Sequence, residues 1–253
     1  MEKETLFVAF STQKGGAGKT ALTVLTSSYM HYVLGKSIAI VDCDYPQYSI
    51  MEMRKRDKDL VMMDDYFKLL AYNQFRGLEK KAYPVVMSDP VNAIDTANKV
   101  IKDSPVKFDI IFFDLPGTMN SKGVVQTLSS MDYIFAPISA DRLVLESTLT
   151  FASSINENLM SVNKSNIKGL FLLWNMVDGR EKTDLYGVYE KVINELGLPL
   201  LKTFIPDTKR FRKEINGVQK QVFRSTLFPP DKQLVKGSNI DMLVDEICQI
   251  LKV

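Results

Sequence analysis

The strongest constraint on the fold is a glycine-rich segment at residues 11–20, with the sequence Ser-Thr-Gln-Lys-Gly-Gly-Ala-Gly-Lys-Thr. It follows the apolar run Leu6–Phe10 and precedes residues that can form a helix. Glycines let backbone N–H groups turn inward around phosphate oxygens, and the following helix directs its positive dipole end at the same anion. In such a loop Lys19 is expected to contact the β- and γ-phosphates, and the Thr20 hydroxyl to ligate Mg²⁺. The segment therefore predicts binding of a nucleoside triphosphate.

This loop departs from the usual phosphate-binding pattern in two ways. Gln13 occupies the first glycine position of G-x-x-x-x-G-K-[ST], and a second lysine, Lys14, precedes the glycines. The K-G-G-x-G-K-T form resembles the deviant Walker A loop of the ParA/MinD superfamily, whose ParA branch commonly has glutamine at the first position. The resemblance implies ATP and Mg²⁺ as cofactors, and an ATP-sandwich homodimer in which Lys14 reaches the nucleotide of the other subunit. A second cation would help neutralise charge on the transferring phosphoryl group. The alternative is a solvated loop lysine.

Two aspartates follow the apolar segment 37–41. Asp42 and Asp44 share a face because side chains alternate along a strand. The segment resembles the family's D-x-D-P-Q motif, in which the first aspartate helps to hold Mg²⁺ and the second orients the attacking water. Here Tyr45 is inserted before the Pro-Gln pair, which leaves the position of Gln47 open.

A third aspartate, Asp114, ends the mostly apolar run Phe108–Phe113, which is typical of a buried parallel strand. It matches the Walker B acid that bonds to the Mg²⁺ shell. A lone aspartate after such a run is often a turn residue, but three motifs in the family's order favour the functional role. The expected metal-binding residues are Thr20, Asp42 and Asp114, and the expected catalytic residues are Lys14, Lys19 and Asp44. The loop residues expected to contact the nucleotide are Gly15, Gly16, Ala17, Gly18, Lys19, Thr20 and Ala21.

Two later segments resemble the family's adenine-binding elements. Residues 170–178 resemble the strand whose terminal asparagine, here Asn175, recognises adenine. The segment Thr203–Asp207 resembles the T-x-I-P element that borders the base, which implicates Pro206 and Asp207. The alternative for Asn175 is an ordinary turn-forming asparagine.

The formal net charge of +2 is unevenly distributed: residues 202–236 hold nine Lys/Arg and three acids. A basic flank of this kind binds DNA phosphates without reading sequence. ParA relatives bind DNA in this way through their C-terminal part, as ATP-bound dimers. Arg210 matches an arginine of the family's I-P-x-x-x-R stretch, whereas Arg212, Lys213 and Arg224 are DNA-binding candidates from charge alone. The alternative is a solvated surface without a partner.

Strand-like and helical patterns alternate along the chain, which predicts an α/β fold with a mostly parallel twisted sheet and helices on both faces. The motifs resemble P-loop NTPases of the deviant Walker A (SIMIBI) type. With 253 residues and 45% hydrophobic composition, residues 1–253 are expected to form a single P-loop ATPase domain. The charged segment 53–59 is expected to be an exposed helix or turn. Helices are expected at Lys19–Val33, Asp64–Asn73, Val91–Ile101, Lys122–Ser129, Leu145–Leu159, Thr183–Leu196 and Ile240–Leu251.

The C-terminal segment argues against membrane attachment. Its apolar residues form one helical stripe, typical of a core-facing helix, and its polar face carries acids that anionic lipid would repel.

Cys43 and Cys248 lack metal-ligand spacing and favour a reducing compartment. The first strand begins within six residues, so we expect no signal peptide and no appended DNA-binding domain. A cytoplasmic protein without a membrane partner is expected, associated with the nucleoid when bound to ATP.

The resemblance implies a slow ATPase that acts in DNA partition or in the transfer of a conjugative element, with the TraA-type ParA-like proteins of conjugative transposons as the nearest type. A ParB-like or other partner protein would stimulate hydrolysis. Two alternatives remain open: an ATP-gated regulatory module that binds a protein, as a MinD-like switch without a membrane helix, and an ATP-dependent ligase of the dethiobiotin-synthetase kind.

Overall fold

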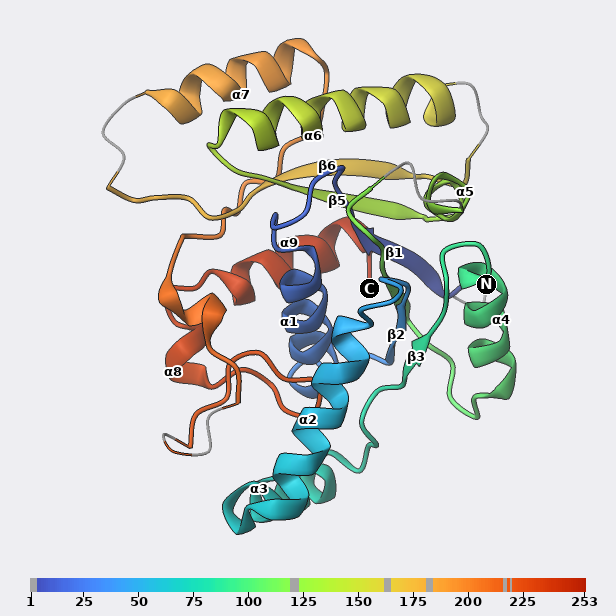
Figure 1. Ribbon diagram of the computed structural model, residues 1–253, viewed down its shortest axis with the longest axis vertical. Coiled ribbons are helices and arrows are strands. Elements are labelled where there is room, and N and C mark those ends of the chain that lie inside the picture. Colours follow the sequence, from blue (N-terminus) through green and yellow to red (C-terminus); the bar gives the residue numbers. More distant parts are fainter. Residues whose placement is uncertain (1–3, 119–122, 162–164, 181–183, 216–217, 219) are drawn as a thin grey trace.

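The computed structural model describes residues 4–118, 123–161, 165–180, 184–215, 218 and 220–253, with Arg212 described by its backbone alone. Its centre is a six-stranded, all-parallel sheet with strand order β3-β2-β4-β1-β5-β6 (Figure 1). The α/β fold predicted from the sequence is therefore confirmed. The strands are β1 (Leu6–Phe10), β2 (Ile38–Asp42), β3 (Val85–Met87), β4 (Ile110–Asp114), β5 (Tyr133–Ile138) and β6 (Gly169–Trp174).

Helices cover both faces of this sheet. The α-helices are α1 (Lys19–Tyr32), α2 (Ser49–Met63), α3 (Asp65–Leu78), α4 (Ala93–Asp103), α5 (Val124–Ser129), α6 (Arg142–Ile155), α7 (Leu185–Glu195), α8 (Lys232–Val235) and α9 (Ile240–Leu251). A π-helical turn, η1 (Asn156–Met160), extends α6, and a 3₁₀ turn, η2 (Lys209–Arg212), precedes α8. In Figure 1, α6 and α7 lie over β5 and β6, whereas α1 and α9 lie on the opposite side of the sheet.

Alternation along the strands divides the core between the two faces. On β1, Val8 and Phe10 belong to the apolar cluster with α1 and α9, whereas Ala9 belongs to the cluster with α4, α5, α6 and α7. The inner strands of a parallel sheet are buried on both faces, which is why they appear in the sequence as nearly continuous apolar runs.

The helix α9 begins and ends at the predicted residues. The segment 53–59, which was expected to be exposed, is exposed only in part. It lies within α2, and two of its charged side chains, Arg54 and Asp57, are buried. Charge alone suggested exposure, but these two groups have hydrogen-bond partners in distant segments. The predicted starts of two helices, Lys122 and Thr183, fall outside the described residues.

The helices α2 and α3 form a hairpin that projects below the sheet in Figure 1. A small third apolar cluster joins this hairpin to the C-terminal part of the chain, where Phe67 and Ala71 of α3 pack with Val222 and Phe228. This packing places residues 222–228 beside α2.

The carboxyl ends of β1, β2 and β4 meet at one edge of the sheet. In the parallel register Asp42 lies directly beside Asp114, and the glycine-rich loop leaves β1 next to them. Ligands of open parallel sheets bind outside this edge.

Candidate nucleotide-binding site

The glycine-rich loop turns through left-handed backbone conformations. Gly16 has φ of 79° and Gly18 has φ of 86°, values that glycine adopts at little cost. A Cβ at Gly18 would also lie 2.5 Å from Nδ2 of Asn175. Leu22 N–H then donates to the Gly18 carbonyl over 2.9 Å and begins α1. The loop therefore ends at a helix N-terminus, as an anion-binding loop requires.

Lys19 is held inside the loop rather than extended into solvent. Its side chain is buried, and its Nζ donates to the Lys14 carbonyl over 2.9 Å. Burial lowers the pKa of Lys19, while the negative charges of Asp114 and Asp44 oppose that shift. The ammonium group thus lies between the loop backbone and the acids that face it.

Thr20 and Asp114 form a direct pair at the carboxyl edge of the sheet. The Thr20 hydroxyl donates to Oδ2 of Asp114 over 2.8 Å, while Oδ1 is buried and has no hydrogen-bond partner among the residues that the structure describes. Burial raises the pKa of Asp114 to about 7; the hydrogen bond from Thr20 opposes this and the nearby charge of Asp42 adds to it. A buried carboxylate oxygen without a donor, next to a hydroxyl, fits a hard cation, because Mg²⁺ takes oxygen ligands. These two residues would hold Mg²⁺.

Asp42 lies in the adjacent strand, but its oxygens are engaged with backbone amides. Its Oδ2 accepts hydrogen bonds from the N–H groups of Ile50 and Met51 at 3.0 and 2.9 Å, in the first turn of α2. The side chain is fully buried, and burial raises its pKa while these hydrogen bonds oppose the rise. In this geometry Asp42 anchors the start of α2, a role that the motif did not indicate.

The segment that follows β2 completes the phosphate side of the site. Asp44 and Gln47 line a hollow of about 420 Å³ together with Gly15, Lys19 and Thr20. The inserted Tyr45 is 66% exposed, so the insertion points outward and Gln47 still faces the loop.

Lys14 is half-buried and directly precedes Gly15, which lines this hollow. Its backbone N–H donates to the Thr12 hydroxyl over 3.2 Å. Within the described ranges its ammonium group forms no hydrogen bond or ion pair. This cation is therefore available to a group outside its own loop.

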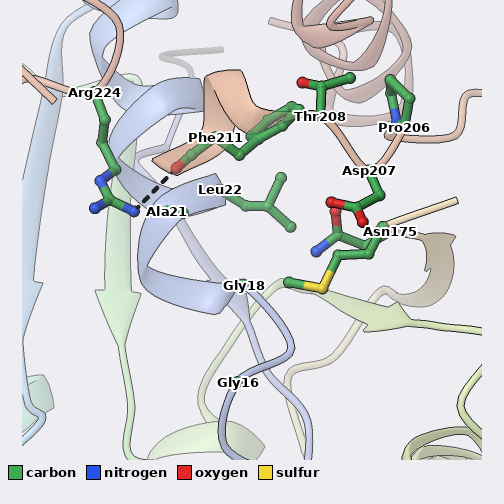
Figure 2. A pocket seen from close by; sticks show the side chains of 11 residues that line it. Gly16, Gly18, Ala21, Leu22, Asn175, Pro206, Asp207, Thr208, Phe211 and Arg224 are labelled. Atoms are coloured by element: carbon green, nitrogen blue, oxygen red, sulfur yellow. Dashed lines mark hydrogen bonds between the residues drawn. The ribbon is translucent and has the colours of Figure 1, made fainter. Parts of the chain in front are cut away.

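A second hollow, of about 440 Å³, lies on the other side of the loop (Figure 2). The expected adenine residues Asn175, Pro206 and Asp207 line it, and so does Ala21. Backbone pairing of Val177 with the 205–207 segment brings these residues to the end of β6. Asn175 is buried and its Nδ2 donates to the Ala17 carbonyl over 2.8 Å, so its amide braces the loop.

Several residues that line the two hollows were not predicted from the sequence. Leu22, Met176, Thr208 and Phe211 border the second hollow. Gly117 borders the first, where a Cβ would lie 3.0 Å from both Gly15 N and Lys19 Nζ. Of these five residues, only Gly117 could have been found from the sequence, because it lies three positions after Asp114.

The four DNA-binding candidates have different surroundings in the fold. Arg210 is half-buried and donates to the Lys236 carbonyl, while Lys213 is exposed and contacts Gln221 over 3.3 Å. The Arg212 side chain lies outside the described residues. Arg224 departs from the expected basic surface: it lines both hollows and forms an ion pair with Glu214. Packing of its segment against α2 turns it inward, which a count of charges could not indicate.

A membrane-spanning helix is not found among the described residues, since none is both long and apolar enough. The apolar stripe of α9 is buried against α1 and the sheet: Ile240, Leu243, Val244, Ile247 and Leu251.

Comparison with known proteins agrees with this geometry. The profile of the CobQ/CobB/MinD/ParA nucleotide-binding domain matches residues 8–219. The chain therefore belongs to this family of nucleotide-binding proteins, which includes the MinD and ParA ATPases. No curated protein sequence matches the chain.

Solved structures share the fold at low sequence identity. The cell division protein MinD of Aquifex aeolicus is 16% identical, with a TM-score of 0.62 and 98% of each chain covered. A plasmid partition protein of Borrelia burgdorferi, described as putative and bound to AMPPNP, is 14% identical, with a TM-score of 0.55 and coverage of 96% of this chain and 98% of that one. MinD of Pyrococcus horikoshii, complexed with Mg-ADP, is 18% identical, with a TM-score of 0.54 and coverage of 98% and 99%.

Proposed function

We propose that this chain is a ParA-type ATPase that dimerises when it binds ATP, binds DNA non-specifically as that dimer, and acts in DNA partition or in maintenance and transfer of a conjugative element of the TraA type. The observation that carries the proposal is that the ammonium groups of the two loop lysines have different surroundings. Lys19 folds back onto the Lys14 carbonyl, whereas the Lys14 ammonium has no partner among the described residues. A cation left unpaired at the rim of a phosphate-binding loop suits a phosphate group of a second subunit.

The described side chains support a division of roles in hydrolysis. Thr20 and Asp114 would hold Mg²⁺, which screens charge on the phosphates when bound. Asp42 supports this site by anchoring α2 beside it. Asp44, at the mouth of the same hollow, would orient the attacking water, and its placement on a short connection suits a step that a partner protein accelerates.

The basic flank supports the DNA-binding part of the proposal. The segment that borders the second hollow also carries four exposed lysines: Lys209, Lys213, Lys232 and Lys236. A surface of this kind would contact DNA phosphates, and its proximity to the nucleotide would make DNA binding depend on ATP. We further propose one ATPase domain over residues 1–253, and a cytoplasmic location with nucleoid association in the ATP form.

Sedimentation with and without ATP tests the dimer. Lys14→Ala and Lys19→Ala are expected to abolish ATP-dependent dimers, whereas Lys55→Ala, an exposed lysine on α2, should behave as the wild type. Asp44→Ala should form dimers but release no phosphate. Unchanged ATP-dependent sedimentation of Lys14→Ala would refute the sandwich dimer.

A mobility-shift assay tests the DNA-binding part. The double variant Lys209→Gln/Lys213→Gln should lose the ATP-dependent shift and keep ATP hydrolysis, and the wild-type shift should weaken at high salt. A wild-type protein that hydrolyses ATP without shifting DNA would favour the protein-binding module instead.

A further inference from the structure

Arg224 occupies a position shared by the two hollows of the site. The first hollow, which Asp44 and Gln47 line, is the phosphate-side hollow, and the second, which Asn175 lines, is the base-side hollow. The two have four residues in common: Gly16, Gly18, Ala21 and Arg224. Among the described residues, Arg224 is the one charged side chain that borders both. A nucleotide that places its base in one hollow and its terminal phosphates in the other must pass its ribose and first phosphate through this shared region. Figure 2 shows the Arg224 guanidinium beside Ala21, in the first turn of α1, across the hollow from Asn175.

The guanidinium is held firmly, yet part of its donor capacity is unused. One Nη donates to Glu214, and the other donates to the Phe211 carbonyl over a long 3.4 Å. The Nε atom is buried and has no hydrogen-bond partner in the described part of the chain, although the side chain as a whole is 22% exposed. An arginine carries five N–H donors in a rigid fork, which suits paired contacts to phosphate oxygens.

The backbone on both sides of Arg224 is tied to the rest of the protein. Its own N–H donates to the Lys213 carbonyl over 3.3 Å, and the N–H of the next but one residue, Thr226, donates to Asp57 of α2 over 2.7 Å. Asp57 also accepts from the Ser225 hydroxyl over 2.9 Å. A side chain mounted on such a segment is preorganised for a ligand.

Arg224 shares its carboxylate partner with a second arginine. Glu214 is shared between Arg224 and Arg56, so one carboxylate serves two guanidinium groups. Asp57, which lines neither hollow, also pairs with Arg56. Within the part of the chain that the structure describes, Arg224 therefore has only a shared carboxylate as its ion-pair partner, and its remaining N–H groups suit phosphate oxygens, which arginine binds in pairs.

We infer that Arg224 is a nucleotide-binding residue that contacts the phosphate next to the ribose, and not a DNA-binding residue. This inference rests on the proposed binding of ATP. It adds a contact from the C-terminal segment to those of the glycine-rich loop. Through Glu214 and Arg56, the same contact links the bound nucleotide to α2.

Binding of adenosine, AMP, ADP and ATP to the full chain, measured by displacement of a fluorescent ATP analogue, tests the inference. Arg224→Gln is expected to lower the affinity for AMP, ADP and ATP by a similar factor of about ten. This is the size expected when one charge-assisted hydrogen bond is lost. Adenosine should bind as it does to the wild type, and Arg224→Lys should recover part of the loss. The matched control is Arg76→Gln, an exposed arginine on α3, which should change nothing.

The outcomes separate this inference from the proposed function. Wild-type protein that fails to bind ATP would refute the proposed function. Wild-type protein that binds ATP, with Arg224→Gln binding all four ligands equally well, would refute the inference alone. Loss confined to ADP and ATP would place the arginine at the terminal phosphates, and an equal loss for adenosine would indicate a packing role; either result overturns the assignment.

Discussion

The hydroxyl of Thr20 donates a hydrogen bond to Oδ2 of Asp114 over 2.8 Å, across 94 positions of sequence. The parallel pairing of β1 with β4 makes this contact, because it places the ends of the two strands side by side. One residue comes from the helix that follows the loop and the other from the end of a buried strand. This part of the site is thus assembled by the sheet itself.

Gly117 should be required for nucleotide binding because its neighbours are backbone and the buried Lys19. A Cβ there would lie 3.0 Å from both Gly15 N and Lys19 Nζ. Gly117→Ala must therefore displace the loop, and overpacking of about 1–3 kcal/mol corresponds to a roughly 5- to 150-fold loss of ATP affinity. Titration calorimetry measures this. Gly77→Ala on α3, where a Cβ meets open space, is the control and should bind ATP normally. Equal affinities for the two variants would contradict the close contact.

Asp42 should contribute to stability through the first turn of α2. Asp42→Ala leaves the N–H groups of Ile50 and Met51 without their acceptor, at a cost of about 1–3 kcal/mol in the free energy of unfolding. Asp42→Asn keeps an acceptor oxygen and should cost less. Urea unfolding gives the free energies, and hydrogen exchange should show faster exchange at residues 50–51. If Asp42→Ala loses Mg²⁺-dependent ATP binding at unchanged stability, then the metal-binding role predicted from the motif outweighs the anchoring role.

Asp57 should be among the most sensitive charged residues of α2. It is fully buried and accepts from Ser225 and Thr226 while pairing with Arg56. Its removal leaves these buried donors without their acceptor, while Arg56 keeps its ion pair with Glu214. At about 1–3 kcal/mol for each unsatisfied buried donor, Asp57→Ala should lower the free energy of unfolding by about 3–5 kcal/mol. Asp59→Ala, two residues further along at an exposed position, should change it by less than about 0.5 kcal/mol. Similar unfolding curves for the two variants would argue against the buried network.

His31, the single histidine of the chain, should make stability depend on pH. Burial lowers its pKa from 6.5 to about 4; the nearby charges of Lys80 and Arg54 act in the same direction, and hydrogen bonding to the Lys81 carbonyl opposes the shift. Above pH 6.5 the residue is neutral in both the folded and the unfolded chain and has no effect. As the pH falls from 6.5 towards 4, only the unfolded chain binds the proton, so stability decreases by up to about 3 kcal/mol.

The check is urea unfolding of wild type and His31→Gln between pH 7 and pH 5, a range in which most carboxylates do not titrate. The variant should show a shallower decrease in the free energy of unfolding. Parallel curves would mean that His31 does not titrate differently in the folded protein.

Local patterns were sufficient for much of the fold and for half of the site. The glycine-rich loop, the apolar strand runs and the helix Ile240–Leu251 are encoded by neighbouring residues, because backbone preference and burial repeat over a few positions. The placement of Thr20 near Asp114 also followed, since parallel strands bring their carboxyl ends to one edge.

The sequence by itself determined that this chain carries a phosphate-binding loop on a parallel sheet, because that loop is a local backbone conformation that its glycines permit. Only the tertiary structure decided which charged residues turn away from solvent. Arg224 looked like one more basic residue of an exposed flank, and Asp57 like one more charge on a solvated helix. Both are turned inward by contacts between segments far apart, such as the 169 positions that separate Asp57 from Thr226. Composition and spacing carry no record of such contacts, because whether a charge is solvated or paired depends on what packs against it.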